Sequence, residues 1–241
     1  MPEQLSKESP TLNKKLIVYL NTDQMITRVT LILSVTLLMC LRASTQIRIY
    51  SNEFLNIGAG SRAFGMGGAQ VASVSDATAG YWNPAGLTGV KNDPSLSLMH
   101  AEYFAGIGKY DFGALAIPVA NNKRTIGLSF LRFAVDDIPN TTQLIDNNGN
   151  VDYDKITTFT AADYAFLLSY ARKLKVEGLS LGGSFKVVYR KVGDFAKSWG
   201  FGLDAGLQYQ RGQHWKFGAV LRDATSTFNA WMFTLDDATK E

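Results

Sequence analysis

The feature that most constrains the fold is an alternation of apolar and polar residues that begins near residue 95. Its clearest run extends from Trp199 to Gln210, where the odd-numbered residues are apolar and the even-numbered ones are small or polar. Successive side chains of a β-strand point to opposite faces, so a period of two predicts strands. Comparable runs predict strands at about 95–104, 109–119, 124–134, 160–172, 179–190, 199–210 and 215–223.

The clearer of these predicted strands are long enough to cross a bilayer. They run for about 10–12 residues, whereas a tilted spanning strand needs about 9–11 and a typical strand has about 5–6. Trp199 and Tyr209 stand at the two ends of one apolar face. With a rise of about 3.3 Å per residue and a tilt of about 45°, they lie roughly 23 Å apart along the membrane normal. Since apolar bands between aromatic girdles are about 25 Å tall, the pattern favours a transmembrane antiparallel β-barrel over a soluble sandwich.

The N-terminal part of the chain predicts a cleavable secretory signal. Val29 to Leu41 is a mainly apolar run of about 13 residues, which suits the core of a signal peptide and is too short to span a bilayer as a helix. Arg28 supplies the positive flank, and small residues at 43–45 offer a cleavage region before Gln46. A buried core helix is the competing interpretation. We therefore predict an unstructured extension over residues 1–24 and a signal peptide over 25–45, with Met1 and Met25 both open as the start.

Charge and cysteine content exclude several classes of protein. After residue 45 the chain has 19 Lys/Arg and 18 Asp/Glu, a net charge of about +1, so no basic face indicates a nucleic-acid partner. The single cysteine, Cys40, lies inside the predicted signal, so the mature protein would have neither a disulfide nor a cysteine nucleophile. A lipoprotein interpretation of Cys40 is opposed by the preceding Met39, because lipid-attachment signals have a small residue there.

A glycine-rich segment follows the predicted signal, within residues 46–92. Its glycines would make a regular helix or a central strand costly, which favours a compact coil with a short helix. Neither the Lys-Ser/Thr of a phosphate loop nor a nucleotide-binding strand–turn–helix unit accompanies them. Asn83, Pro84, Ala85 and Gly86 form a predicted turn. The glycines that define the segment are Gly58, Gly60, Gly65, Gly67 and Gly68.

The string GAGSRAFGMGGAQVA, followed by WNPAGL, resembles the start of PorV/PorQ-family proteins, within the wider FadL-like group of outer-membrane barrels. The resemblance is close over residues 54–90, and the strand pattern of residues 95–233 is similar to that of the family. It implies a bacterial outer-membrane barrel of about 14 strands. The Asn-Pro-Ala-Gly motif would then lie in a plug or gate over residues 46–92, and residues 93–241 would supply the barrel strands.

Few residues suggest a catalytic, binding or metal site. Lys186 and Asp204 face the predicted lumen from adjacent strands, where they would line a path or neutralise each other. Residues 146–154 are rich in oxygen ligands but lack the order of a calcium loop, so a solvated turn is the preferred interpretation and no metal site is predicted. His100 and His214 lie on different predicted elements, and no catalytic set is recognisable. We expect neither a cofactor nor an enzyme.

Three functions remain open. The resemblance implies a component of the type IX secretion system, with outer-membrane lipid, other secretion proteins and secreted substrates as partners. The alternative is a FadL-like channel that takes up hydrophobic small molecules, and the third is a purely structural barrel. An apolar tunnel beneath the Asn-Pro-Ala-Gly turn would favour the channel, and a protein-filled lumen with apolar extracellular loops would favour the secretion component.

The strand count gives one further expectation. We count seven spanning strands, whereas single-chain bacterial barrels have an even number, and an open edge facing lipid leaves polar backbone groups unpaired. The aromatic-rich run Thr225 to Phe233 is interpreted as a surface loop. We therefore expect the sequence to cover about half of the family's barrel, with an oligomer of half-barrels as the alternative.

Overall fold

A computed structural model describes residues 34, 52–145, 148–225 and 227–234. The chain divides into two compact units, Met1–Ile49 and Tyr50–Glu241, and the elements below belong to the second. The predicted extension and signal peptide, including Cys40, lie outside the described residues apart from Ser34. Among the described residues, no helix combines the length and apolar character needed to cross a membrane.

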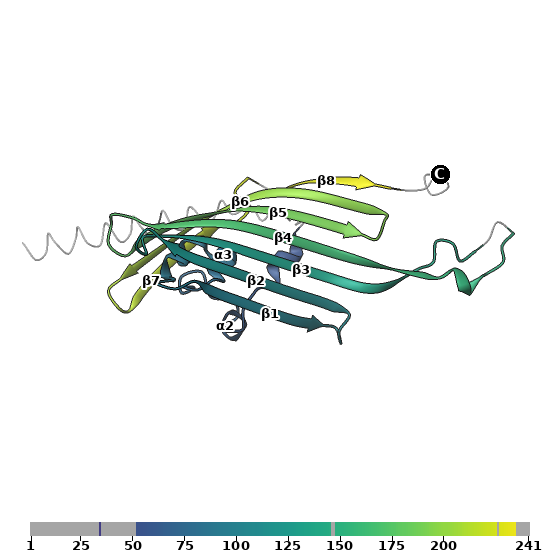
Figure 1. The fold of residues 1–241 in the computed structure, drawn as a ribbon, viewed down its shortest axis with the longest axis horizontal. Coiled ribbons are helices and arrows are strands. Elements are labelled where there is room, and N and C mark those ends of the chain that lie inside the picture. Colours follow the sequence, from purple (N-terminus) through teal and green to yellow (C-terminus); the bar gives the residue numbers. More distant parts are fainter. Residues whose placement is uncertain (1–33, 35–51, 146–147, 226, 235–241) are drawn as a thin grey trace, which may run out of the picture. The chain divides into compact units, whose positions relative to one another are not determined.

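The second unit is built on one antiparallel sheet that forms a half-barrel, so the expectation of an all-β fold is confirmed (Figure 1). The first seven strands follow one another across the sheet in chain order, so each of the first six pairs with the next, whereas the eighth pairs with the sixth. Their order matches the alternation in the sequence closely. The bounds are β1 Ser95–Tyr103, β2 Gly108–Val119, β3 Arg124–Asn140, β4 Thr157–Lys173, β5 Leu179–Val192, β6 Ala196–Arg211, β7 Trp215–Leu221 and β8 Phe228–Phe233.

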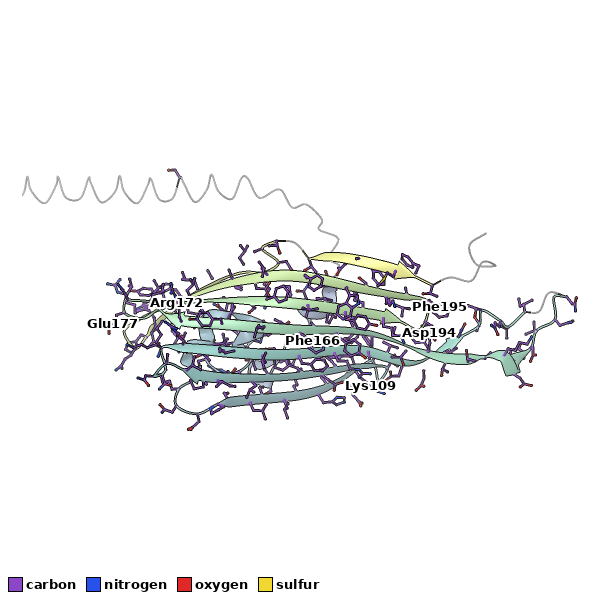
Figure 2. The ribbon with its side chains drawn as sticks, turned by 45° about the horizontal axis from the view of Figure 1, so that its top comes forward. Lys109, Phe166, Arg172, Glu177, Asp194 and Phe195 are labelled. Atoms are coloured by element: carbon purple, nitrogen blue, oxygen red, sulfur yellow. The ribbon has the colours of Figure 1, made fainter. Side chains whose placement is uncertain are left out.

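The connections distinguish the two ends of the sheet. Residues 120–123, 174–178 and 212–214 make short connections at one end, which we call the turn end. At the other end, which we call the loop end, the connection between β3 and β4 extends well past the neighbouring strands (Figure 1). Figure 2 shows Arg172 and Glu177 at the turn end and Asp194 and Phe195 towards the loop end.

Two predictions about the loop end were wrong. The predicted strand bounds leave residues 191–198 between β5 and β6, but the link is only Gly193–Phe195. Strands β3 and β4 also run several residues further than predicted, past a bulge where the register shifts between Val135 and Ile138. In each case the backbone ladder continues after the regular alternation of apolar and polar residues has ended, so a hydrophobic pattern alone places the strand ends too early.

The interpretation of Thr225 to Phe233 as a surface loop was also wrong. Residues Phe228–Phe233 form β8, which pairs with the same edge of β6 as β7 does. Strand β7 pairs with residues 205–211 of β6 and β8 with residues 196–201, so together they occupy one position in the sheet. Strands β7 and β8 therefore act as one strand position that is interrupted after Leu221 and resumes at Phe228.

The N-terminal segment, residues 52–94, packs against the inner face of the sheet. It contains four short helices, namely η1 Glu53–Asn56, α2 Ser61–Gly65, α3 Ala79–Trp82 and η2 Pro84–Gly89. Inward-facing residues such as Ala116, Leu131 and Val188 are fully buried in a core that they share with Leu87 of this segment. Since the outer face exposes alternate apolar residues along the same strands, the described residues cover only one face of the sheet.

Candidate functional site

The Asn-Pro-Ala-Gly motif lies at the start of η2 and is clamped between the rest of the N-terminal segment and the sheet. The Asn83 side chain caps η2 by accepting a hydrogen bond from the Ala85 N–H at 3.2 Å. Its amide donates to the Val71 carbonyl at 2.8 Å and to the Leu207 carbonyl of β6 at 3.1 Å. Asn83 is fully buried, so one side chain starts the helix and attaches it to the barrel wall.

Glycines of the barrel wall allow η2 to approach the strands closely. A Cβ atom at Gly182 of β5 would collide with the backbone of Pro84 and Ala85, and one at Gly206 of β6 would collide with Asn83 Oδ1. Both glycines face inward in the strand alternation. The backbone of η2 is therefore seated directly on the backbones of β5 and β6, with no space for a tunnel between them.

Side-chain hydrogen bonds fix the same segment from both sides. Gln208 of β6 donates to the carbonyls of Val71 and Val74, at 3.0 and 3.1 Å. Thr88 of η2 donates to the hydroxyl of Ser180 on β5 at 2.8 Å. Because these bonds come from two adjacent strands, the motif is positioned by the wall as well as by its own helix.

The glycine-rich residues wrap around Trp82. Gly58 and Gly68 lie against the Trp82 ring, and a Cβ at either position would fall 3.4–3.5 Å from it. The indole N–H donates to the Ala59 carbonyl at 2.8 Å. Gly60 precedes α2 as its N-cap with a φ of 91°. Gly65 and Gly67 face open space among the described residues. The predicted compact coil with a short helix is thus present, but only some of its glycines mark close contacts.

Lys186 and Asp204 both project from the inner face, where the structure brings them together with a third residue that the sequence reasoning missed. The Lys186 ammonium lies 2.9 Å from Asp204 Oδ1 and 2.7 Å from Asp223 Oδ1. The backbone N–H of Asp223 also donates to Asp204 at 2.8 Å. The Lys186 side chain is only 3% exposed, so this is a buried ion cluster and not an open path. Asp223 could not have been found by strand alternation, because it lies in the interruption between β7 and β8.

The adjacent Arg222 reaches the N-terminal segment. Its guanidinium carbon lies 5.1 Å from the ring centroid of Tyr81 and 5.5 Å from that of Trp82, within the range of cation–π attraction. The Tyr81 hydroxyl donates to the Leu55 carbonyl. Burial raises the pKa of Tyr81 despite the opposing charge of Arg222, so this hydroxyl stays protonated as a donor at neutral pH.

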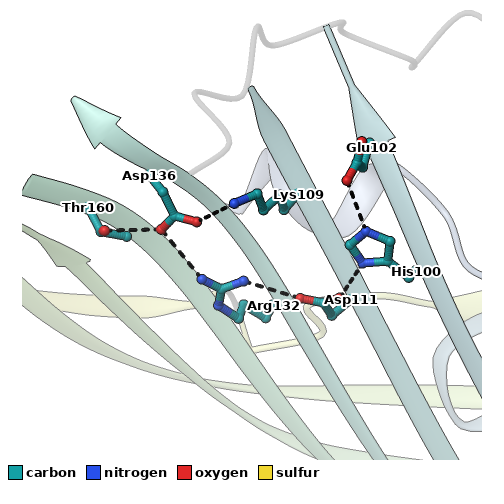
Figure 3. A network of polar contacts seen from close by, with 7 residues as sticks. All are labelled: His100, Glu102, Lys109, Asp111, Arg132, Asp136 and Thr160. Carbon is teal, nitrogen blue, oxygen red and sulfur yellow. Dashed lines mark hydrogen bonds and ion pairs between the residues drawn. The ribbon is translucent and has the colours of Figure 1, made fainter. Parts of the chain in front are cut away.

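The outer face carries a polar network at its loop end (Figure 3). His100 Nδ1 lies 2.7 Å from Asp111 Oδ1, and Arg132 Nη1 lies 3.2 Å from Asp111 Oδ2. Asp136 joins the network through Arg132, whose Nη2 lies 3.7 Å from Asp136 Oδ1, and it also contacts Lys109, whose Nζ lies 3.0 Å from Asp136 Oδ2. These residues come from three adjacent strands and point away from the covered inner face. His100 lies on a different element from His214, as predicted, but its partners were not predicted because their contact depends on strand register.

Cross-strand register arranges the rest of the outer face in rows. The row that begins with the network becomes aromatic on the later strands and comprises His100, Asp111, Arg132, Tyr164, Tyr189 and Trp199. The next two rows towards the turn end contain only apolar residues and glycine: Leu98, Gly113, Phe130, Phe166, Val187 and Phe201, then Leu96, Leu115, Leu128, Leu168, Phe185 and Leu203. Below these, the paired Arg124 and Arg172 end the apolar band on β3 and β4.

Little in the described residues suggests catalysis or metal binding. No group of three or more His, Cys, Asp or Glu residues that could hold a metal ion occurs in the described part of the chain. The oxygen-rich stretch at 146–154 lies partly outside it, and His214 sits in the connection between β6 and β7. No family model matches this chain, and no curated protein matches it either. The site that the geometry defines is therefore a packed junction between the N-terminal segment and the barrel wall.

Proposed function

We propose that this chain forms part of an outer-membrane β-barrel that binds exported or surface proteins, in the manner of the PorV/PorQ-like components of the type IX secretion system that its sequence resembles. The observation that carries the proposal is the filled inner face. Where a channel for hydrophobic molecules would need a tunnel beneath Asn83–Gly86, the helix η2 is seated on the backbones of Gly182 and Gly206. A barrel whose interior is occupied by its own segment is suited to bind partners at its ends and not to pass solutes.

The outer face supports a membrane location. Its apolar rows lie in large part exposed to the surroundings, as shown by Leu98, Phe166 and Leu203, although the opposite face is buried. An uncovered apolar surface of this extent is unfavourable in water and expected in lipid. The row Tyr164, Tyr189 and Trp199 borders it with amphipathic rings, the residue type enriched where a bilayer meets water.

The loop end supports a protein partner. Apolar side chains stand exposed on two separate connections there, with Phe104 80% and Tyr153 73% exposed. Ile107 lies on the same connection as Phe104, and Ile145 and Val151 on the same one as Tyr153. Long connections of outer-membrane barrels lie outside the cell, so these side chains would meet extracellular proteins. Exposed aromatic and aliphatic residues at such positions are typical of binding sites.

The test is affinity purification of the tagged full chain from bacterial envelopes in mild detergent, with identification of the proteins retained. Exported or envelope proteins should copurify with the natural chain. The double variant Phe104→Ser and Ile107→Ser should lose them, because it removes the apolar contacts without touching the packed interior. The matched control is Leu96→Ser and Leu98→Ser, which changes two exposed apolar residues on β1 that face lipid in the proposal.

The outcomes separate the alternatives. Loss of the partners in the loop variant alone would support protein binding at the loop end. Retention of hydrophobic small molecules without any protein partner would instead favour a FadL-like channel and contradict the proposal. Equal loss in both variants would mean that the loop residues have no special role.

A further inference from the structure

The turn end of the sheet carries a strong excess of positive charge. The connections and strand ends gathered there contain eight Lys/Arg, namely Lys91, Lys123, Arg124, Arg172, Lys173, Lys175, Arg211 and Lys216. The same stretches contain only two carboxylates, Asp93 and Glu177. The difference, eight minus two, is six positive charges. The second unit as a whole is nearly neutral, so this charge is concentrated in one place.

Four of these cations surround a cavity of about 840 Å³. Lys91, Lys173, Arg211 and Lys216 line it, and Glu177 is the only carboxylate among the lining residues. The volume lies within the range of roughly 300–1,000 Å³ that is usual for small-ligand sites. Hydroxyl and amide groups of Ser75, Ser180 and Gln208 complete the wall, so the cavity is polar as well as cationic.

The cations of the cavity lack partners of opposite charge. Among the described residues, none of the four has a carboxylate oxygen within 4.0 Å, whereas Lys186 and Arg190 deeper in the sheet are both paired. Like charges held together around a concave surface raise the local potential and attract anions.

The cavity is preformed by hydrogen bonds that do not involve these charges. The β4–β5 connection is closed by the Leu174 N–H bonded to the Leu179 carbonyl at 2.8 Å, and Gln210 N–H donates to the Gly178 carbonyl at 2.9 Å. On the opposite side, Asn92 and Asn122 exchange hydrogen bonds at 2.9 and 3.0 Å beside Lys91. The backbone that carries these cations is therefore held in place independently of a ligand.

We infer that the cavity at the turn end binds a phosphate-bearing anion. Phosphate is the anion class that clustered lysines with neighbouring hydroxyl and amide groups bind best, because its charge and its several oxygens engage both. The phosphate could belong to a soluble compound or to a phospholipid headgroup. The site would exist whether or not the chain binds exported proteins, since it lies at the other end of the sheet from Phe104 and Tyr153.

The experiment is calorimetric titration of inorganic pyrophosphate into the full chain, folded in a neutral detergent at low salt. Lys173→Gln and Lys216→Gln should each weaken binding about fivefold, the effect of one unit charge at about 4 Å in water. Glu177→Gln should strengthen binding by a similar factor, a gain that a merely misfolded protein would not show. The matched controls Lys155→Gln and Lys197→Gln remove the same charge from the loop end and should leave binding unchanged.

A second arm identifies the source of the phosphate. In nanodiscs, replacing part of a phosphatidylcholine bilayer with phosphatidylglycerol should weaken pyrophosphate binding if a lipid headgroup occupies the cavity, and should leave it unchanged if the ligand is soluble. Either result supports the site and assigns its ligand. Absence of pyrophosphate binding to the natural chain would overturn the inference. Equal weakening by the loop-end controls, or no strengthening by Glu177→Gln, would overturn it as well.

Discussion

Replacing Gly182 by Ala should separate the Asn-Pro-Ala-Gly helix from the barrel wall. The added Cβ would collide with the backbone of Pro84 and Ala85 and lie 2.7 Å from the Pro84 carbonyl oxygen. Backbone cannot rotate away as a side chain can, so η2 and β5 must move apart. Overpacking of this kind costs about 1–3 kcal/mol, and loss of the nearby Thr88–Ser180 hydrogen bond adds about 1 kcal/mol. We expect a total loss of about 2–4 kcal/mol in the free energy of unfolding.

The matched control is the next residue. A Cβ at Gly183 would point to the outer face and lie 3.6 Å from the Asp204 carbonyl oxygen, an ordinary contact. Gly183→Ala should therefore stabilise the protein slightly, by about 0.5–1 kcal/mol, since glycine is unfavourable within a strand. Urea titration of the folded chain in lipid measures both variants, and limited proteolysis shows whether residues 52–94 have become accessible. Equal stabilities for the two variants would refute the proposed seating of η2 on the wall.

Three other substitutions test separate parts of the structure. Leu203→Arg, on the outer face, should cost about 2–4 kcal/mol in a folding titration from urea into lipid. The control Gln210→Arg, at the exposed turn end of the same strand, should cost less than about 1 kcal/mol. Similar costs for the two variants would contradict the assignment of the lipid face. Lys186→Met should cost about 3–5 kcal/mol because it leaves the buried Asp204 and the half-buried Asp223 without a counter-charge. The control Lys191→Met, which breaks a surface pair, should cost under about 1 kcal/mol in the same urea titration. Arg222→Leu should expose residues 52–94 to protease more readily, with Arg211→Leu as the control; unchanged cleavage would show that the contact with Tyr81 and Trp82 does not hold the segment.

The alternation in the sequence predicted the strands well because it records a physical asymmetry between the two faces of the sheet. On β6 every second residue from Trp199 to Tyr209 faces outward, and the residues between them are glycine or polar because they pack against the N-terminal segment or one another. Where that asymmetry ends, the prediction failed. The hairpin around Gly193 and the course of β8 depend on backbone pairing of residues such as Lys191 and Lys197, which have no apolar pattern to reveal it.

The candidate site shows the same limit. Asn83 and Gly206 belong to different predicted elements, and each could be recognised alone, Asn83 as a turn residue and Gly206 as a glycine in a strand. Their contact depends on how η2 lies across β5 and β6, which no local pattern encodes. Lys186 and Asp204 were predicted to share a face because both obey the alternation on neighbouring strands. Asp223 was not predicted because it lies outside the paired strands. The network around Asp111 was not predicted because it depends on the register between neighbouring strands.

The interruption of the seventh strand has a physical explanation that joins these features. Arg222, Asp223 and Ala224 leave the regular ladder, so their backbone groups need other partners within the sheet. The Asp223 N–H donates to the Asp204 carboxylate and the Ala224 N–H to the Leu203 carbonyl, each at 2.8 Å. Asp204 is itself held by Lys186, so the buried charge cluster serves as the substitute partner for the broken ladder. The inward turn also brings Arg222 onto Tyr81, and the break in the wall is therefore one of the places where the wall holds the N-terminal segment.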